Sequence, residues 1–198
     1  MHPKEFKHEK AGTGRLTHLS LSESEILMGV GFDEDKRFNE LINDPRYFHS
    51  ILYPGPKAIN LSNLSELPII PSEKKLLVFL IDGTWSTAKK MMKLTTKLHQ
   101  LPRFTFTANQ KSIFDIKQQP HPDCLSTLEA VHFLLFELSR LNIDNYPDQD
   151  YFFNLLQNMQ NYQKECAADP NRQGYRHRAF KKPEERKSMK TFKRKIIF

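Results

Sequence analysis

Apolar runs separated by polar turns predict the first elements of the chain. Residues 1–23 are polar and contain a glycine-rich turn. The apolar run at residues 26–32 includes two glycines, so we expect a strand there that another backbone approaches closely. Residues 36–42 predict a short helix, and residues 50–53 predict a strand that stops at Pro54-Gly55-Pro56.

The strongest strand signal is the continuous apolar run KLLVFLI at residues 75–81. A run without polar alternation is typical of a central strand that is covered on both faces. A helix is expected to follow over residues 85–99. Met91, Leu94 and Leu98 mark its buried side, and four lysines mark its solvent side: Lys89, Lys90, Lys93 and Lys97.

The second half of the chain is helical around one long loop. Residues 104–107 predict a strand, and residues 108–124 form a polar, proline-containing loop of the length that often carries function. Apolar stripes predict helices over residues 127–141 and 149–164. The alternation of strands and helices predicts an α/β fold with a mainly parallel sheet.

The net charge of +7 is concentrated at the C-terminus. Eleven Lys and Arg residues lie between Arg172 and Lys195, against two Glu, so the preceding part is close to neutral. We therefore expect a domain over residues 1–170 and a basic tail over residues 171–198. A solvated tail is the simpler interpretation. Interleaved aromatic residues favour an arm that binds RNA through Arg176, Arg178, Lys181 and Lys182.

Membrane and secreted classes are not indicated. No apolar run approaches the roughly 18–20 residues that cross a bilayer, and the chain opens without a charged and apolar leader. Cys124 and Cys166 cannot form a disulfide framework and have no metal-ligand spacing, so we expect two buried thiols, no metal and a cytoplasmic location.

Two loop-to-helix junctions carry candidate chemistry. In Leu80-Ile81-Asp82-Gly83-Thr84-Trp85, a buried strand delivers an acid, a hydroxyl and the single tryptophan to a helix start, where ligands of open α/β sheets bind. In the second junction, Ser126 and Glu129 match a capping box. The alternative for both is structural, with Asp82 or Thr84 capping a helix and Trp85 in the core.

Together these junctions resemble the DTW-domain family of tRNA-uridine aminocarboxypropyltransferases. The blocks that carry the resemblance, in chain order, are His2-Pro3-Lys4-Glu5, Thr13-Gly14-Arg15-Leu16, Tyr53-Pro54-Gly55, Asp82-Gly83-Thr84-Trp85, Gln119-Pro120 and Ser126-Thr127-Leu128-Glu129-Ala130. The resemblance implies transfer of the 3-amino-3-carboxypropyl group from S-adenosylmethionine to N3 of a uridine in tRNA. It also implies a SPOUT-like, knotted fold, with a mainly parallel sheet flanked by helices.

The resemblance also implies where the site lies. The expected cofactor-binding residues are Tyr53, Pro54, Gly55, Leu80, Ile81, Asp82, Gly83, Thr84, Trp85, Leu125, Ser126 and Thr127. The expected catalytic residues are Asp82, Thr84 and Trp85. Uridine N3 must lose a proton before it attacks, and Asp82 is the candidate general base. Trp85 has several open roles: stacking on adenine, on uracil or on the sulfonium, or packing in the core.

Expected RNA contacts in the folded part are Arg15, Lys89, Lys90 and Lys117. Family members usually have an Arg at the position of Lys117, and lysine loses the bidentate geometry for anions. They also usually have cysteine pairs and an apolar strand before the His-Pro block. This chain begins at Met1, so we expect an open sheet edge.

Two other functions stay open on the sequence. The chain could be a basic RNA-binding module without catalysis, or an enzyme of the same fold that modifies ribosomal RNA or transfers a methyl group. The first binds RNA without cofactor, and the second differs in product mass. No segment identifies a face for self-association.

Overall fold

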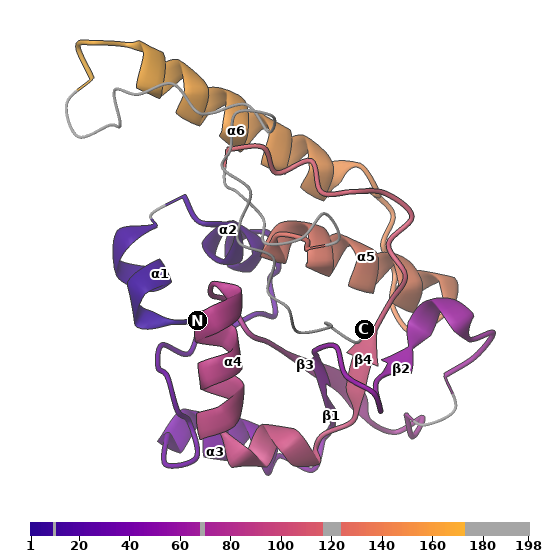
Figure 1. Ribbon diagram of the computed structural model, residues 1–198. Helices are drawn as coiled ribbons and strands as arrows, with labels where there is room; N and C mark the ends of the chain where they lie inside the picture. Colours follow the sequence, from indigo (N-terminus) through magenta and orange to yellow (C-terminus); the bar gives the residue numbers. More distant parts are fainter. Residues whose placement is uncertain (10, 68–69, 117–123, 173–198) are drawn as a thin grey trace.

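The computed structural model describes residues 1–9, 11–67, 70–116 and 124–172 (Figure 1). In this part of the chain, four parallel strands form one sheet in the order β2-β4-β1-β3. The strands are β1 (Tyr47–Leu52), β2 (Ile59–Asn60), β3 (Lys75–Leu80) and β4 (Arg103–Thr105). The coarse prediction of a mainly parallel α/β sheet is confirmed.

Strand register places the candidate loops together. β1 pairs with β3 from Tyr47 opposite Lys75 to Leu52 opposite Leu80, and β4 pairs with β1 at Leu52 and Phe104. Because the strands are parallel, the segments that follow them leave the sheet at the same end, where the carboxyl ends of the strands lie. The loop after Leu52 and the loop after Leu80 therefore start side by side.

Helices cover both faces of this sheet. They are α1 (Pro3–His8), α2 (Thr13–Ser20), α3 (Lys36–Ile42), α4 (Trp85–Leu94), α5 (Thr127–Arg140) and α6 (Tyr151–Ala168), with short 3-10 turns η1 (Leu61–Asn63) and η2 (Thr96–Gln100). On one face, α3 and α4 pack Phe38 and Met91 against Ile51 of β1. On the other face, α5 packs Leu134 against Phe104 of β4.

A further layer lies outside α5. Leu128 of α5 shares a core cluster with Phe152 and Leu156 of α6, and Leu16 of α2 packs against the same cluster. Figure 1 shows α6 lying across the outer side of α5, away from the sheet. α5 therefore packs against the sheet on one side and against α6 on the other.

β3 confirms one part of its prediction and contradicts another. Its side chains alternate between the two cores, with Phe79 on the α3–α4 side and Val78 and Leu80 on the α5 side. Both faces are covered, as the apolar run predicted. The strand is nevertheless at the sheet edge, and β1 lies between β3 and β4. A continuous apolar run indicates covered faces, and it carries no information about neighbouring strands.

The run at residues 26–32 does not form a strand. Its apolar side chains pack against the α3–α4 core, but its backbone bonds go elsewhere. Gly29 N–H donates to the carbonyl of Met1, and Phe32 N–H donates to Thr95 Oγ1. The polar segment 1–23, in which no helix was predicted, contains α1 and α2.

The helix predicted over residues 85–99 ends earlier, at Leu94. The buried hydroxyl of Thr95 accepts the Phe32 N–H at 3.3 Å, and η2 follows. Leu94 is 46% exposed and is not on the buried side. Lys97 is not a free solvent-side lysine, because its Nζ donates to the carbonyl of Asp33 at 3.0 Å.

The other helix predictions are close to the structure. Lys36–Ile42 is a helix with the predicted bounds, and the predicted helices at 127–141 and 149–164 correspond to α5 and α6. Within the described ranges, none of the helices combines the length and apolar character needed to cross a bilayer.

Candidate active site

One hydrogen bond joins the two junctions that the sequence singled out. Asp82 follows the end of β3, and Thr127 is the first residue of α5. Thr127 Oγ1 donates to Asp82 Oδ1 at 2.6 Å. The sequence predicted each junction separately, and the structure places the acid of the first against a hydroxyl of the second.

Other hydroxyls at these junctions cap the N-termini of the helices. Thr84 is the N-cap of α4, and its Oγ1 accepts from Thr87 N–H at 3.3 Å. Ser126 and Glu129 form the predicted capping box of α5. The structural alternative therefore holds for Thr84 and Ser126. It does not describe Asp82, whose carboxylate accepts from a residue of another helix.

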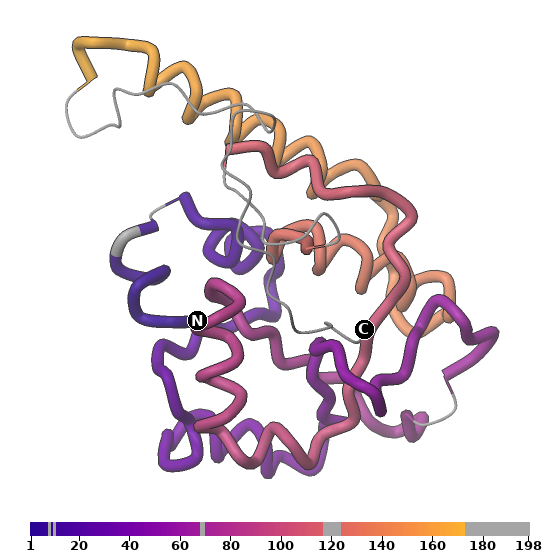
Figure 2. Tube along the Cα trace, viewed as in Figure 1, coloured from indigo at the N-terminus to yellow at the C-terminus, as the bar shows by residue number. Residues whose placement is uncertain are grey.

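The start of the chain closes on Asp82 from the other side. His2 N–H donates to the Asp82 carbonyl at 2.9 Å. A Cβ at Gly14 of α2 would lie 2.4 Å from the Cγ and Oδ1 atoms of Asp82, so only glycine fits there. Figures 1 and 2 show the chain start beside the first turn of α4. Asp82 is thus enclosed by α2, α5 and the first residues.

This enclosure has an electrostatic effect at Met1. The Met1 amino group donates to the carbonyl of Leu27 at 2.7 Å. Burial lowers the pKa of this amino group, and the negative charge of Asp82 opposes that effect. Sequence reasoning missed the approach of the chain start to Asp82, because it joins segments that are far apart in the sequence.

Trp85 is partly buried at the first position of α4. Within the described part of the chain, it belongs to none of the three hydrophobic core clusters. The N–H groups of Trp85 and Ser86 donate to no described residue, as expected for the first turn of a helix. The start of α4 therefore combines an indole ring outside the three core clusters with two N–H groups that have no partner in the described ranges.

Arg103 places a positive charge beside the loop that contains Tyr53 and Gly55. Arg103 of β4 lies with its guanidinium carbon 6.0 Å from the centre of the Tyr53 ring. A Cβ at Gly55 would meet Arg103 Nη1 at 2.9 Å. Burial raises the pKa of Tyr53, and Arg103 opposes the shift. Sequence reasoning missed Arg103, because its proximity to the loop depends on the β1–β4 pairing.

The remaining cofactor candidates occupy the expected loops: Pro54, Leu80, Ile81, Gly83 and Leu125 are all partly buried. Gly83 is closely packed, since a Cβ there would lie 2.6 Å from Thr87 Oγ1. The structure thus brings the segments 53–55 and 80–85 together at the carboxyl ends of the strands. The hydrogen bond from Thr127 links the segment 125–127 to them.

The predicted RNA contacts lie in different settings. Lys89 and Lys90 are exposed on α4. Arg15 makes internal contacts, because it donates to the Phe6 carbonyl at 2.8 Å and lies 4.6 Å from the Phe6 ring centre. The remaining predicted contacts lie outside the described residues: Lys117, Arg176, Arg178, Lys181 and Lys182.

The long polar loop is anchored where it is described. The buried Glu129 carboxylate accepts from Ile113 N–H at 2.7 Å and from Ser112 Oγ at 2.9 Å. Gln160 of α6 accepts from Asp115 N–H at 2.6 Å. Glu129 therefore has two roles, since it also completes the capping box next to Thr127.

The prediction of two buried cysteines is confirmed, since Cys124 and Cys166 are both buried and they do not form a disulfide. In the described ranges, no three His, Cys, Asp or Glu side chains come together as a metal-binding group.

Relatives of known name match part of the chain. It is 38% identical over 94 residues to tRNA-uridine aminocarboxypropyltransferase 2 of Mus musculus and 34% identical over 93 residues to the protein of that name from Macaca fascicularis. Each match covers 46% of this chain and 30% of the relative. The Drosophila melanogaster protein of that name is 34% identical over 80 residues, which cover 40% of this chain and 30% of the relative. The match thus spans less than a third of these proteins.

No solved structure matches the chain at a significant level. The family model described as DTW domain matches residues 1–164, which include both junctions and the chain start that encloses Asp82. The chain belongs to the DTW domain family.

Proposed function

We propose that this chain transfers the 3-amino-3-carboxypropyl group from S-adenosylmethionine to N3 of a uridine in tRNA. The observation that carries the proposal is the 2.6 Å hydrogen bond from Thr127 to Asp82, which joins both family motifs in one site. The names of the matched relatives support the same reaction. The site lies at the carboxyl edge of a parallel sheet, where ligands of such folds bind.

The residues at this edge fit S-adenosylmethionine. Its carboxylate needs N–H donors, and Trp85 and Ser86 offer theirs at the start of α4. Its adenine and sulfonium need an aromatic or apolar surface, which Trp85 and the ends of the strands provide. When bound, the cofactor supplies an electrophilic methylene carbon next to its sulfonium.

Asp82 is proposed to take the proton from uridine N3. Thr127 fixes the carboxylate through Oδ1, and Gly14 allows it to lie close to α2. A positioned base of this kind contributes roughly 10²–10⁴-fold to rate. A carboxylate placed beside the sulfonium instead would stabilise the ground state, because that charge disappears as the bond breaks. Asp82 therefore acts on the uridine side.

Thr84 and Trp85 act on the other reactant in this proposal. Thr84 holds the first turn of α4 in place, so that the free N–H groups point out of the fold. Trp85 lies next to those groups and stacks on the ligand. Selection of the methylene over the methyl carbon then depends on orientation, because the attacking nitrogen must lie about 3–3.5 Å from the correct carbon.

For tRNA binding, we propose contacts from Lys89 and Lys90 and from the basic tail. If the tail contacts five to seven phosphates, a chain ending at Pro170 should show a salt slope of binding lower by about 4–6 units. An unchanged slope would exclude the tail. We also propose a SPOUT-like fold over residues 1–170, which the parallel sheet of the described strands supports. A cytoplasmic location is proposed from the reaction alone.

The test combines binding with product identification. S-adenosylmethionine is titrated calorimetrically into the protein and into Trp85→Ala, and tRNA nucleosides are then analysed by mass spectrometry. We expect micromolar binding that Trp85→Ala weakens, and a uridine that gains one aminocarboxypropyl group. A methylated product would indicate a methyltransferase, and RNA binding without cofactor binding would indicate a non-catalytic module.

A further inference from the structure

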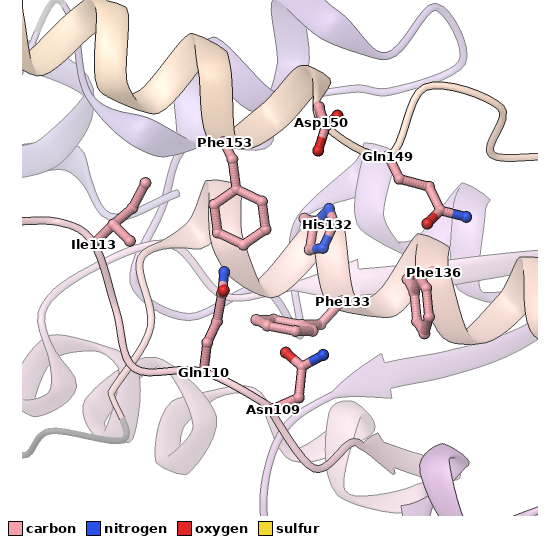
Figure 3. Close-up of a pocket in the computed structure, with 9 residues that line it drawn as sticks. All are labelled: Asn109, Gln110, Ile113, His132, Phe133, Phe136, Gln149, Asp150 and Phe153. Atoms are coloured by element: carbon pink, nitrogen blue, oxygen red, sulfur yellow. The ribbon is translucent and has the colours of Figure 1, made fainter.

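A cavity lies outside the site described above. It has a volume of about 450 Å³ and lies between α5, α6 and the loop that follows β4 (Figure 3). Rings from the two helices form its walls: His132, Phe133, Phe136 and Phe153. Its size is within the range of roughly 300–1,000 Å³ that is usual for ligand sites.

The rings in the walls pack against one another at an angle. The His132 and Phe153 rings lie 4.3 Å apart between centres at 60°, and the Phe133 and Phe153 rings lie 6.1 Å apart at 81°. His132 and Phe133 are buried, while Phe153 is partly exposed. The Phe153 ring is therefore the one that can stack on a planar heteroaromatic ligand.

His132 contributes an imidazole ring to the cavity wall. Burial lowers the pKa of this imidazole, which favours its neutral form. Its Nδ1 lies 3.1 Å from the Tyr146 hydroxyl, and either group can donate in this pair. Nε2 bonds to none of the residues that the structure describes.

Polar side chains face one another across the rim. Asn109 and Gln110 come from the loop after β4, and Gln149 and Asp150 come from the segment before α6 (Figure 3). Asp150 occupies the N-cap position of α6, but its carboxylate does not cap the helix. It lies close enough to His132 to act on the imidazole charge. The cavity thus combines a carboxylate acceptor, an imidazole ring and three amides.

This combination matches the edge and faces of a nucleobase. Proteins recognise unpaired RNA bases by stacking them on aromatic rings and by hydrogen bonds to their edges. Asp accepts from the amino group of cytosine, and Asn or Gln pairs with adenine. Uracil has no exocyclic amino group and offers a carboxylate only its N3–H. A preference for bases that carry an amino group is therefore expected of this cavity.

We propose that this cavity binds an unpaired base that carries an exocyclic amino group, such as cytosine or adenine, in the RNA substrate. The proposal rests on the proposed function for the identity of RNA as substrate. An RNA base is favoured over a free small molecule because all four polar rim residues are exposed, whereas small-molecule sites bury roughly 70–90% of their ligand. The ribose and phosphate stay outside.

The cavity is mechanically linked to the candidate active site. Ile113 lines the cavity, and its N–H donates to Glu129, which also accepts the Ser126 N–H at the start of α5. Thr127, the next residue, contacts Asp82. His132 lies five residues beyond Thr127, or about 7.5 Å along the helix.

The test measures binding of RNA octamers of cytidine, adenosine or uridine by fluorescence anisotropy, without cofactor. The full chain is compared with Asp150→Asn, which replaces the acceptor by a group that can also donate. Asp148→Asn is the control, because it makes the same charge change in the same segment outside the cavity. Phe153→Leu removes the ring, and Tyr162→Leu removes an exposed ring elsewhere on α6.

We expect the unaltered chain to bind cytidine and adenosine octamers about tenfold more tightly than uridine octamers. Asp150→Asn should abolish this preference, and Asp148→Asn should keep it. Phe153→Leu should weaken all three by about tenfold, and Tyr162→Leu should leave them unchanged. Absence of any base preference in the unaltered chain, or equal behaviour of variants and controls, would overturn the proposal.

Titration of S-adenosylmethionine into the same variants distinguishes the two sources of a base. If Asp150→Asn and Phe153→Leu weaken cofactor binding and leave RNA binding unchanged, the cavity holds the cofactor adenine and the proposal is wrong. Failure of the proposed function has a different signature. If the chain shows the base preference but transfers no group to tRNA, the result supports the cavity proposal and contradicts the proposed reaction.

Discussion

The contact between Gly14 and Asp82 gives the most quantitative prediction. An alanine Cβ at position 14 would lie 2.4 Å from the Cγ and Oδ1 atoms of Asp82 and 2.7 Å from Oδ2. Ordinary carbon contacts are about 3.5–4.0 Å, so the carboxylate must move by roughly 1 Å. Such overpacking costs about 1–3 kcal/mol in the free energy of unfolding. Gly14→Ala should therefore be destabilised by that amount.

A double-mutant cycle isolates this contact. Asp82→Ala removes all three atoms that the new Cβ would meet, so Gly14→Ala should cost little in that background. Urea denaturation followed by circular dichroism gives the four free energies, and we expect a coupling of about 1–3 kcal/mol. The control is Gly31→Ala, whose Cβ would lie 3.3 Å from Leu94 and away from Asp82; it should show no coupling to Asp82→Ala.

Activity provides the second readout. A displacement of about 1 Å at a catalytic group costs on the order of 100-fold in rate, so Gly14→Ala should lose about that much kcat/KM in the transfer assay. Additive stability effects within about 0.5 kcal/mol, together with unchanged transfer, would refute the close packing of α2 on Asp82.

Three further predictions concern stability. Glu129→Ala leaves the Ser126 and Ile113 N–H groups without their acceptor and should cost about 3–5 kcal/mol in chemical denaturation, with Glu129→Gln costing less; equal costs for both would contradict this. Burial lowers the pKa of His132 below its unfolded value near 6.5, so the unfolded chain binds the proton first and stability should fall as pH drops below about 6.5. His132→Gln should reduce this fall in Tm, and an identical pH profile would count against it. The buried Ser50 hydroxyl has no hydrogen-bond partner among the described residues, so Ser50→Ala should be neutral or stabilising by up to about 1 kcal/mol; a clear loss in thermal unfolding would show that the hydroxyl is satisfied.

Local patterns were sufficient for several elements. The capping box at Ser126 and Glu129 and the apolar stripe behind it predicted α5, because both signals lie within one helix. The apolar run of β3 predicted a strand covered on both faces for the same reason. Its edge position could not be predicted, because strand order depends on pairing between distant segments.

Long-range contacts also determined what the sequence could not show at the site. Thr127 and Asp82 are 45 residues apart, and nothing in either motif specifies their hydrogen bond. The end of α4 at Leu94 has a similar origin, since the Thr95 hydroxyl accepts from Phe32, 63 residues away. Arg103 reaches the Tyr53 loop only because β4 pairs with β1.

Asp82 is the central group of the proposed reaction, because it prepares uridine for transfer. The most direct measurement is the single-turnover rate of aminocarboxypropyl transfer to tRNA, from pH 6 to pH 9, for the unaltered chain and for Asp82→Asn. We predict a rate lower by roughly 10²–10⁴-fold in Asp82→Asn, with S-adenosylmethionine binding retained. Transfer by Asp82→Asn at the rate of the unaltered chain across this pH range would contradict the role of Asp82.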